Sequence, residues 1–131
     1  LICKILKQYN ETRVGFPVLL SEDKNIDKKE QLEKEEKYWN DIVEEMIFHF
    51  QEAVEETCTK TNPYENPGKP YFYKENPNDA FYKMEIDYDS EKEKEEAQNH
   101  FKTEMELEKY RLEHKKKGFE MLSKYINYIW D

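Results

Sequence analysis

Apolar side chains recur every seven residues near the C-terminal end of the chain. The first heptad position holds four large apolar residues: Met105, Leu112, Phe119 and Ile126. The companion position holds three more apolar residues, namely Phe101, Leu122 and Ile129. Trp130 ends the segment. This spacing is typical of a long helix that packs one side against other helices. With Ser90 and Glu93 as a capping box, it predicts a helix over residues 90–130.

Two further helices are predicted from the same kind of spacing. The first has an i, i+4 apolar stripe over residues 1–9 and is broken by Gly15 and Pro17. Asp27 and Glu30 resemble a capping box that starts a second helix over residues 27–59. Its charged lead-in gives way to an apolar face made of these residues: Trp39, Ile42, Val43, Met46, Ile47, Phe50, Ala53 and Val54.

Residues 60–88 differ from the rest because they hold four of the five prolines. A short unit, an Asn-Pro turn followed by an aromatic pair, occurs twice there. One interpretation is a long connection, pinned across the helices by its aromatic rings, that can form a small β-hairpin. The other is an aromatic recognition arm that presents these four rings: Phe72, Tyr73, Phe81 and Tyr82.

Length and composition define the fold class that we expect. At 131 residues, with 37% hydrophobic and 39% charged residues, the chain can build one modest core. We therefore predict a single domain over residues 1–131 of the mainly α class. Its architecture would be an elongated three-helix bundle with two long helices and the Pro/Tyr-rich connection between them.

The charge and hydropathy patterns limit the kinds of partner and the cellular location that we expect. The formal net charge is -9, and residues 21–59 carry 13 acidic and 5 basic residues. Such a chain repels phosphate backbones, so nucleic acid is an unfavourable partner. No apolar run approaches the ~20 residues that span a bilayer, and no signal peptide is visible. We expect a cytoplasmic protein, and further residues before Leu1 because the chain opens within a helical pattern.

Three sequence motifs occur along the chain in an order that is found in another group of proteins. Residues 39–50 resemble a Trp–acid–"MI"–aromatic helix, and residues 118–131 resemble a helix closing on "LWD". Residues 5–17 are similar to a helix followed by a "GYP"-type loop. In this order the chain resembles small helical proteins encoded by tailed bacteriophages and related bacterial elements, over about a third of its length. The resemblance implies a phage-like origin and a compact helical core, and supplies no catalytic residue.

No residue pattern points to catalysis, a metal or a cofactor. Di-iron bundles use Glu-x-x-His on two helices, whereas Glu45 and His49, like His100 and Glu104, stand one turn apart. The chain also has no glycine-rich phosphate loop. Cys3 and Cys58, both inside predicted helices, are interpreted as reduced thiols, with a disulfide as the alternative. We predict a non-enzymatic protein with neither metal nor cofactor.

One flank of the second helix is acidic. Four carboxylates line it, namely Asp41, Glu45, Glu52 and Glu56, and residues 41–56 contain no Lys or Arg. This flank is either a solvated face, partly neutralised by residues 115–117, or an acidic surface that docks on a basic partner.

Two functional hypotheses of different classes follow. The first is an accessory protein that binds a host or phage protein, and inhibits it, through the acidic flank and the aromatic arm. The alternative is a structural protein that forms homodimers through its heptad stripe. A third, single-strand binding by stacked aromatic rings, conflicts with the negative charge.

Overall fold

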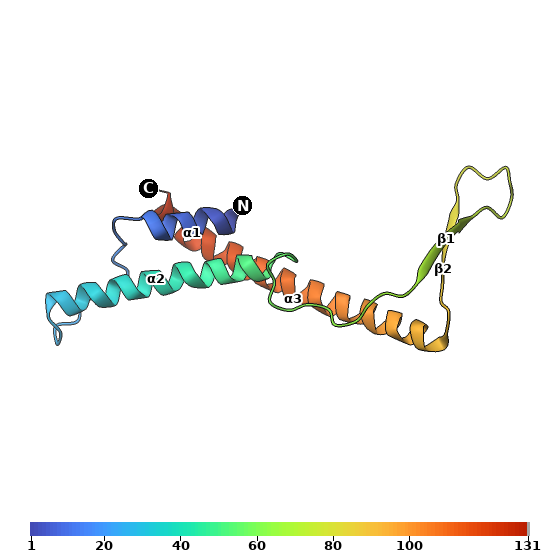
Figure 1. Ribbon diagram of the computed structural model, residues 1–131. Helices are drawn as coiled ribbons and strands as arrows, with labels where there is room; N and C mark the ends of the chain where they lie inside the picture. Colours follow the sequence, from blue (N-terminus) through green and yellow to red (C-terminus); the bar gives the residue numbers. More distant parts are fainter. Residues whose placement is uncertain (131) are drawn as a thin grey trace. The chain divides into compact units, whose positions relative to one another are not determined.

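The structure, a computed structural model, describes residues 1–130. In chain order these residues form α1 (Ile2–Thr12), α2 (Lys28–Glu52), β1 (Lys69–Tyr73), β2 (Lys83–Asp87) and α3 (Glu91–Ile129) (Figure 1). The mainly α class with a small β-hairpin is therefore confirmed. The chain divides into two compact units: unit 1, residues 1–59 and 110–131, and unit 2, residues 60–109. The single domain stays a prediction.

The helix starts agree with the capping signals in the sequence. The Glu30 amide donates to the Asp27 side chain over 2.7 Å at the start of α2. At the start of α3, the Glu93 amide donates to Ser90 Oγ over 3.2 Å. Side-chain oxygens at these positions satisfy amide groups that the first turn of a helix leaves without partners.

The helix ends differ from the prediction. The first helix continues to Thr12, where the hydroxyl donates to the Gln8 carbonyl over 2.7 Å. The second helix ends at Glu52 instead of Thr59. Beyond it the chain turns, because the Cys58 amide bonds to the Val54 carbonyl and the Thr59 amide bonds to the Glu52 carboxylate. Cys58 is consequently buried in this turn rather than in a helix, and both cysteines are free thiols.

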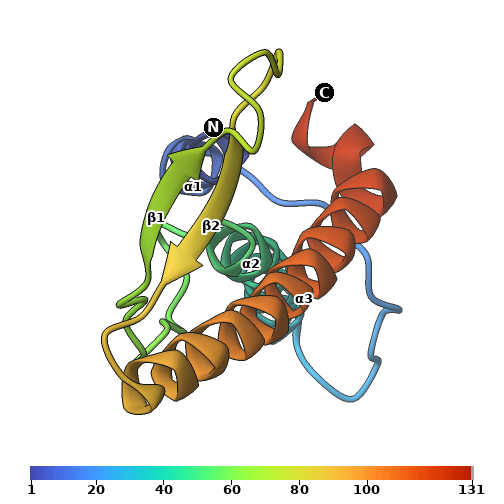
Figure 2. The same cartoon turned by 90° about the vertical axis from the view of Figure 1, so that its right-hand side faces the viewer.

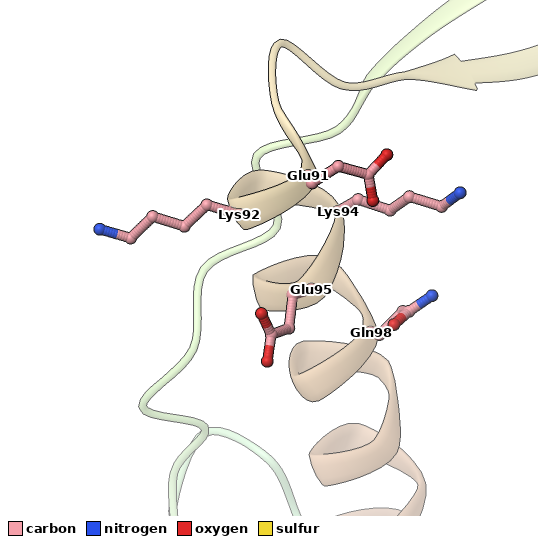
Figure 3. A pocket seen from close by; sticks show the side chains of 5 residues that line it. All are labelled: Glu91, Lys92, Lys94, Glu95 and Gln98. Carbon is pink, nitrogen blue, oxygen red and sulfur yellow. The ribbon is translucent and has the colours of Figure 1, made fainter.

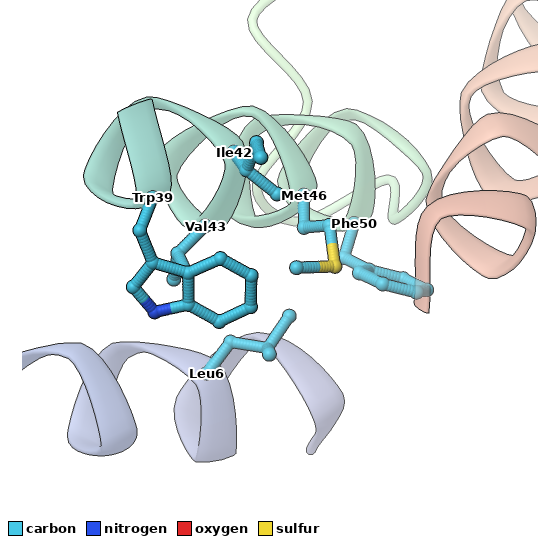
Figure 4. Packing of buried hydrophobic residues seen from close by; sticks show 6 residues of the cluster. All are labelled: Leu6, Trp39, Ile42, Val43, Met46 and Phe50. Atoms are coloured by element: carbon cyan, nitrogen blue, oxygen red, sulfur yellow. The ribbon is translucent and has the colours of Figure 1, made fainter. Parts of the chain in front are cut away.

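Unit 1 has its hydrophobic core between α1 and α2. Six buried side chains form this core, one from α1 and five from α2 (Figure 4): Leu6, Trp39, Ile42, Val43, Met46 and Phe50. Residues of α3 pack against it from the C-terminal part of that helix: Met121, Leu122, Tyr125 and Ile129. Trp39 makes edge-on ring contacts with Tyr9 and Tyr125, at centroid distances of 6.5 and 5.8 Å.

The first heptad position of α3 does not pack as expected. Its four residues are exposed, at 72% for Met105, 56% for Leu112, 44% for Phe119 and 40% for Ile126. Phe101 and Trp130 are exposed as well, and only the companion residues Leu122 and Ile129 join the core. The prediction that this stripe packs against the other helices holds for Leu122 and Ile129 and is wrong for Met105 and Leu112. The face that packs in unit 1 is the adjacent one, which carries Met121 and Tyr125.

Gly118 of α3 lies against the ring of Phe50, near the end of α2. A Cβ added at this glycine would meet the ring of Phe50 at 3.1 Å. That is tighter than ordinary van der Waals contact, so the ring needs the space that glycine leaves. Phe50 also contacts the ring of Phe119, edge to face, at a centroid distance of 5.1 Å.

The loop between α1 and α2 is fastened by a buried carboxylate. Glu35 of α2 is only 1% exposed. Its oxygens accept the amide of Leu19 over 3.0 Å, the amide of Leu20 over 3.1 and 3.2 Å, and the Gln31 side chain over 3.1 Å. This carboxylate pins to α2 a segment that has no regular structure of its own.

Candidate functional site

The β1–β2 hairpin of unit 2 is the strongest candidate for a contact surface. Its strands run antiparallel (Figure 2) with Tyr71 opposite Glu85 and Phe72 opposite Met84. Residues directly opposite each other share a face, and successive residues alternate between faces. One face therefore carries tyrosines and charged residues, and the other carries the apolar set that we call the apolar face: Pro70, Phe72, Met84 and Ile86.

The polar face is held together by its own side chains. The hydroxyls of Tyr71 and Tyr73 donate to the two oxygens of Glu85, over 2.6 and 2.8 Å. The hydrogen bond to Glu85, with smaller effects of burial and nearby carboxylates, raises the pKa of Tyr71 to about 12. The same two bonds lower the pKa of Glu85. Because the two tyrosine hydroxyls and the Glu85 carboxylate already bond to one another, these groups are satisfied without a binding partner.

The apolar face, in contrast, is open to solvent. Phe72 is 65% exposed and Met84 is 56% exposed, and Ile86 beside them is 38% exposed. A two-stranded hairpin alone is marginally stable in water and gains stability when its apolar side is covered. Exposed apolar surface of this kind marks sites of interaction with other proteins.

The loop between the two strands adds two further rings. Phe81 and Tyr82 are 85% and 67% exposed. Lys74 Nζ lies 4.7 Å from the centre of the Tyr82 ring, and the Asp79 amide bonds to the Asn76 carbonyl over 2.9 Å. Local contacts thus shape the loop while leaving its rings accessible.

Three of the four predicted arm residues are accessible on the hairpin, namely Phe72, Phe81 and Tyr82. Tyr73 is half-buried on the opposite face and bound to Glu85. Sequence reasoning missed Met84 and Ile86. Their signal is the alternation of apolar and acidic residues over 84–87, which is typical of a strand with one apolar face.

Only some residues of the predicted acidic flank are exposed to solvent. Asp41, which pairs with Lys37 over 2.8 Å, and Glu45 are exposed on α2. Glu56 is exposed too, but it lies beyond the end of α2. Glu52 is 0% exposed, so its predicted place on an accessible acidic face is wrong.

Glu52 is buried because it organises the end of α2. Its carboxylate accepts hydrogen bonds from the Thr59 amide over 2.8 Å, from the Thr59 hydroxyl, and from the Tyr110 hydroxyl over 2.9 Å. Burial alone would raise the pKa of Glu52, but these hydrogen bonds outweigh it and leave the pKa lowered. The carboxylate therefore stays ionised in the interior and acts structurally.

The histidines are engaged with neighbouring polar groups in each unit. In unit 1, His49 Nδ1 and His114 Nδ1 are 2.8 Å apart. In unit 2, His100 Nδ1 donates to the Tyr64 carbonyl over 2.8 Å, and the Asn62 amide donates to Glu104 over 2.9 Å. Among residues 1–130, no three His, Cys, Asp or Glu side chains gather in a way that could hold a metal ion.

The surface depressions show no convergent chemistry. One depression of about 530 Å³ lies along the first turns of α3 and is lined by five residues: Glu91, Lys92, Lys94, Glu95 and Gln98. Their side chains point in different directions (Figure 3). Another of about 400 Å³ in unit 1 is mostly apolar and includes Phe50, Val54 and Phe119, with Lys115 as its charged residue. Cys3 also lines the second depression, among mostly apolar side chains.

The comparisons with known proteins give no match. No family model, no curated protein and no solved structure is similar to this chain. The resemblance to phage-encoded helical proteins therefore stays a prediction. In the described part of the chain, every helix is too short or too polar to cross a membrane.

Proposed function

We propose that the protein acts without catalysis, by binding another protein through the apolar face and loop of the β1–β2 hairpin. The observation that carries this proposal is the contrast between the two faces. On the polar face, Glu85 accepts hydrogen bonds from Tyr71 and Tyr73, whereas on the apolar face Phe72 and Met84 are exposed to solvent. Aromatic anchors with few rotatable bonds contribute strongly to protein interfaces.

In this proposal the chain is a phage-type accessory protein that works in the cytoplasm of a host cell and inhibits a host or defence protein. The three helices serve as its helical scaffold. Asp41, Glu45 and Glu56 add an accessible acidic surface, which would steer a basic partner toward the protein.

The proposal is tested by partner capture with a double variant, Phe72→Ser with Met84→Ser. Both side chains are exposed, so the variant should keep the helical circular-dichroism signal of the wild type. We expect quantitative mass spectrometry of proteins captured from lysate of the host cell to show a specific partner reduced at least about tenfold, which corresponds to ~1.4 kcal/mol.

The matched control is Val14→Ser with Val18→Ser, which removes two apolar side chains that are even more exposed but lie in the α1–α2 loop. Capture by this control should equal that of the wild type. Equal recovery of the partner by the hairpin variant would overturn the proposal, as would the absence of any specific partner in the wild-type capture.

Self-association is the second candidate, and the exposed residues of α3 in unit 1 favour it. Leu112, Phe119 and Ile126 repeat every seven residues on one helix face and are 56%, 44% and 40% exposed. Helices with such a stripe associate to cover it. We expect light scattering to show a dimer for the wild type, a monomer for Leu112→Gln with Ile126→Gln, and a dimer for the control Leu32→Gln on α2. A wild type that remains monomeric at high concentration would exclude this candidate.

A further inference from the structure

A cluster of polar side chains lies inside unit 1, between the end of α2 and residues 110–117 of α3. His49 is 7% exposed and Glu52 is fully buried, while His114 and Tyr110 are half-buried. The rings of Tyr110 and His114 meet at a centroid distance of 4.5 Å, and the edge contact of Phe48 with His114 measures 5.5 Å. The proposed binding function does not use any of these groups.

The hydrogen bonds of the two imidazoles fix how many protons they can hold. His49 Nε2 lies 3.3 Å from a carboxylate oxygen of Glu45, which can only accept, so Nε2 carries a proton. The 2.8 Å contact between the two Nδ1 atoms then needs a single proton between them. When the pair is neutral, His114 donates to His49. After one protonation, the two Nδ1 atoms still share a single proton, and His49 Nε2 still donates to Glu45.

A second proton cannot be accommodated in this geometry. It would place two N–H donors, both on cationic rings, against each other at the observed Nδ1 separation. The groups that face the pair come from both helices: Glu45 and Glu52 of α2, and Tyr110, Glu113 and Lys117 of α3. Burial lowers the pKa of His114 most, the charges of His49 and Lys117 lower it further, and Glu52 and Glu113 oppose the shift.

We propose that the His49–His114 pair is a proton-sensitive clamp that holds the end of α2 against α3 in unit 1 and opens when both imidazoles are protonated. Opening stays local to the pair and to Phe48. The bonds of Glu52 with Thr59 and Tyr110 persist, because Glu52 remains ionised at the mildly acidic pH that releases the clamp.

The direction of the pH effect follows from proton linkage. The pKa of His114 is lower in the folded chain than its ordinary value of 6.5. The unfolded chain therefore binds more protons as the pH falls below that value, and each such proton favours unfolding. The contribution of the clamp to stability is complete above the ordinary value. It is lost as the pH falls from there toward the pKa of the folded state.

The test compares urea unfolding of the full chain at pH 7.5 and pH 5.0. We expect the unfolding constant of the wild type to rise by up to about tenfold for each pH unit below the ordinary histidine pKa. His114→Gln, which keeps hydrogen-bonding capacity without titrating, should show a clearly smaller rise. The control His100→Gln, which removes a histidine from unit 2, should behave like the wild type. An equal pH response of His114→Gln and the wild type would overturn the clamp.

A second measurement uses the wild type alone. We expect histidine ring signals in nuclear magnetic resonance spectra to show His114 titrating below 6.5, with amide shifts confined to residues near His49 and His114. Titration of His114 at or above its ordinary value, or no amide shift at these positions, would refute the proposal even if the glutamine variant failed to fold.

Discussion

Replacing Trp39 by alanine is expected to lower the free energy of unfolding of unit 1 by about 3–5 kcal/mol. The indole is fully buried at the centre of the core and touches residues from all three helices. Its Nε1 donates to the Tyr9 hydroxyl over 3.1 Å, so the substitution also removes a hydrogen bond between α1 and α2. Alanine leaves a cavity that rings packed edge-on cannot fill without losing their contacts with each other.

Urea unfolding followed by circular dichroism at 222 nm measures this loss. Tyr38→Ala is the matched control, because it removes a neighbouring aromatic ring that is 40% exposed. We expect the control to stay within about 1 kcal/mol of the wild type. A loss of less than 1 kcal/mol for Trp39→Ala would contradict the core described for unit 1.

Replacing Glu35 by alanine should destabilise unit 1 by about 2–4 kcal/mol. Its carboxylate accepts the backbone amides of Leu19 and Leu20, and a buried donor that loses its acceptor costs about 1–3 kcal/mol. Glu35→Gln should also destabilise, since its amide group would turn a donor toward these donors. Because the loop before α2 loses its attachment, limited proteolysis should cut residues 14–26 faster.

The neighbouring Glu36→Ala serves as the control for both measurements. Glu36 is exposed, so its removal should leave the unfolding midpoint and the proteolysis rate close to those of the wild type. A Glu35→Ala variant that matched this control would show that the buried carboxylate does not hold the loop.

Much of the fold is predictable from the sequence because local signals control it. Asp27 and Ser90 carry the side-chain oxygens that helix starts require, and both cap helices in the structure. The apolar face that begins at Trp39 forms the core. The paired Asn-Pro turns with aromatic residues allowed a small hairpin as part of one interpretation, and β1 and β2 form one.

Contacts between distant residues account for what the sequence did not predict. The end of α2 depends on Thr59 and Tyr110 meeting Glu52, and local periodicity continues past that point. The heptad pattern of α3 showed which residues share a face, but not whether the chain itself covers that face. The pattern therefore places Leu112 and Phe119 on one helix face correctly, but these side chains are exposed instead of buried. The histidine pair joins residues 65 positions apart, so no local motif reveals it.

The two-stranded sheet has a consequence for handling the protein in concentrated solution. Each strand pairs with the other on one side, so within the described chain its outer edge offers unpaired amides and carbonyls to further strands. Pro70 lacks an amide hydrogen, and Lys69 and Lys83 hold charged ion pairs with Asp89 and Glu75 beside the strands, which discourages stacking of copies. Neutralising these lysines should therefore promote fibrous precipitation before any helix melts.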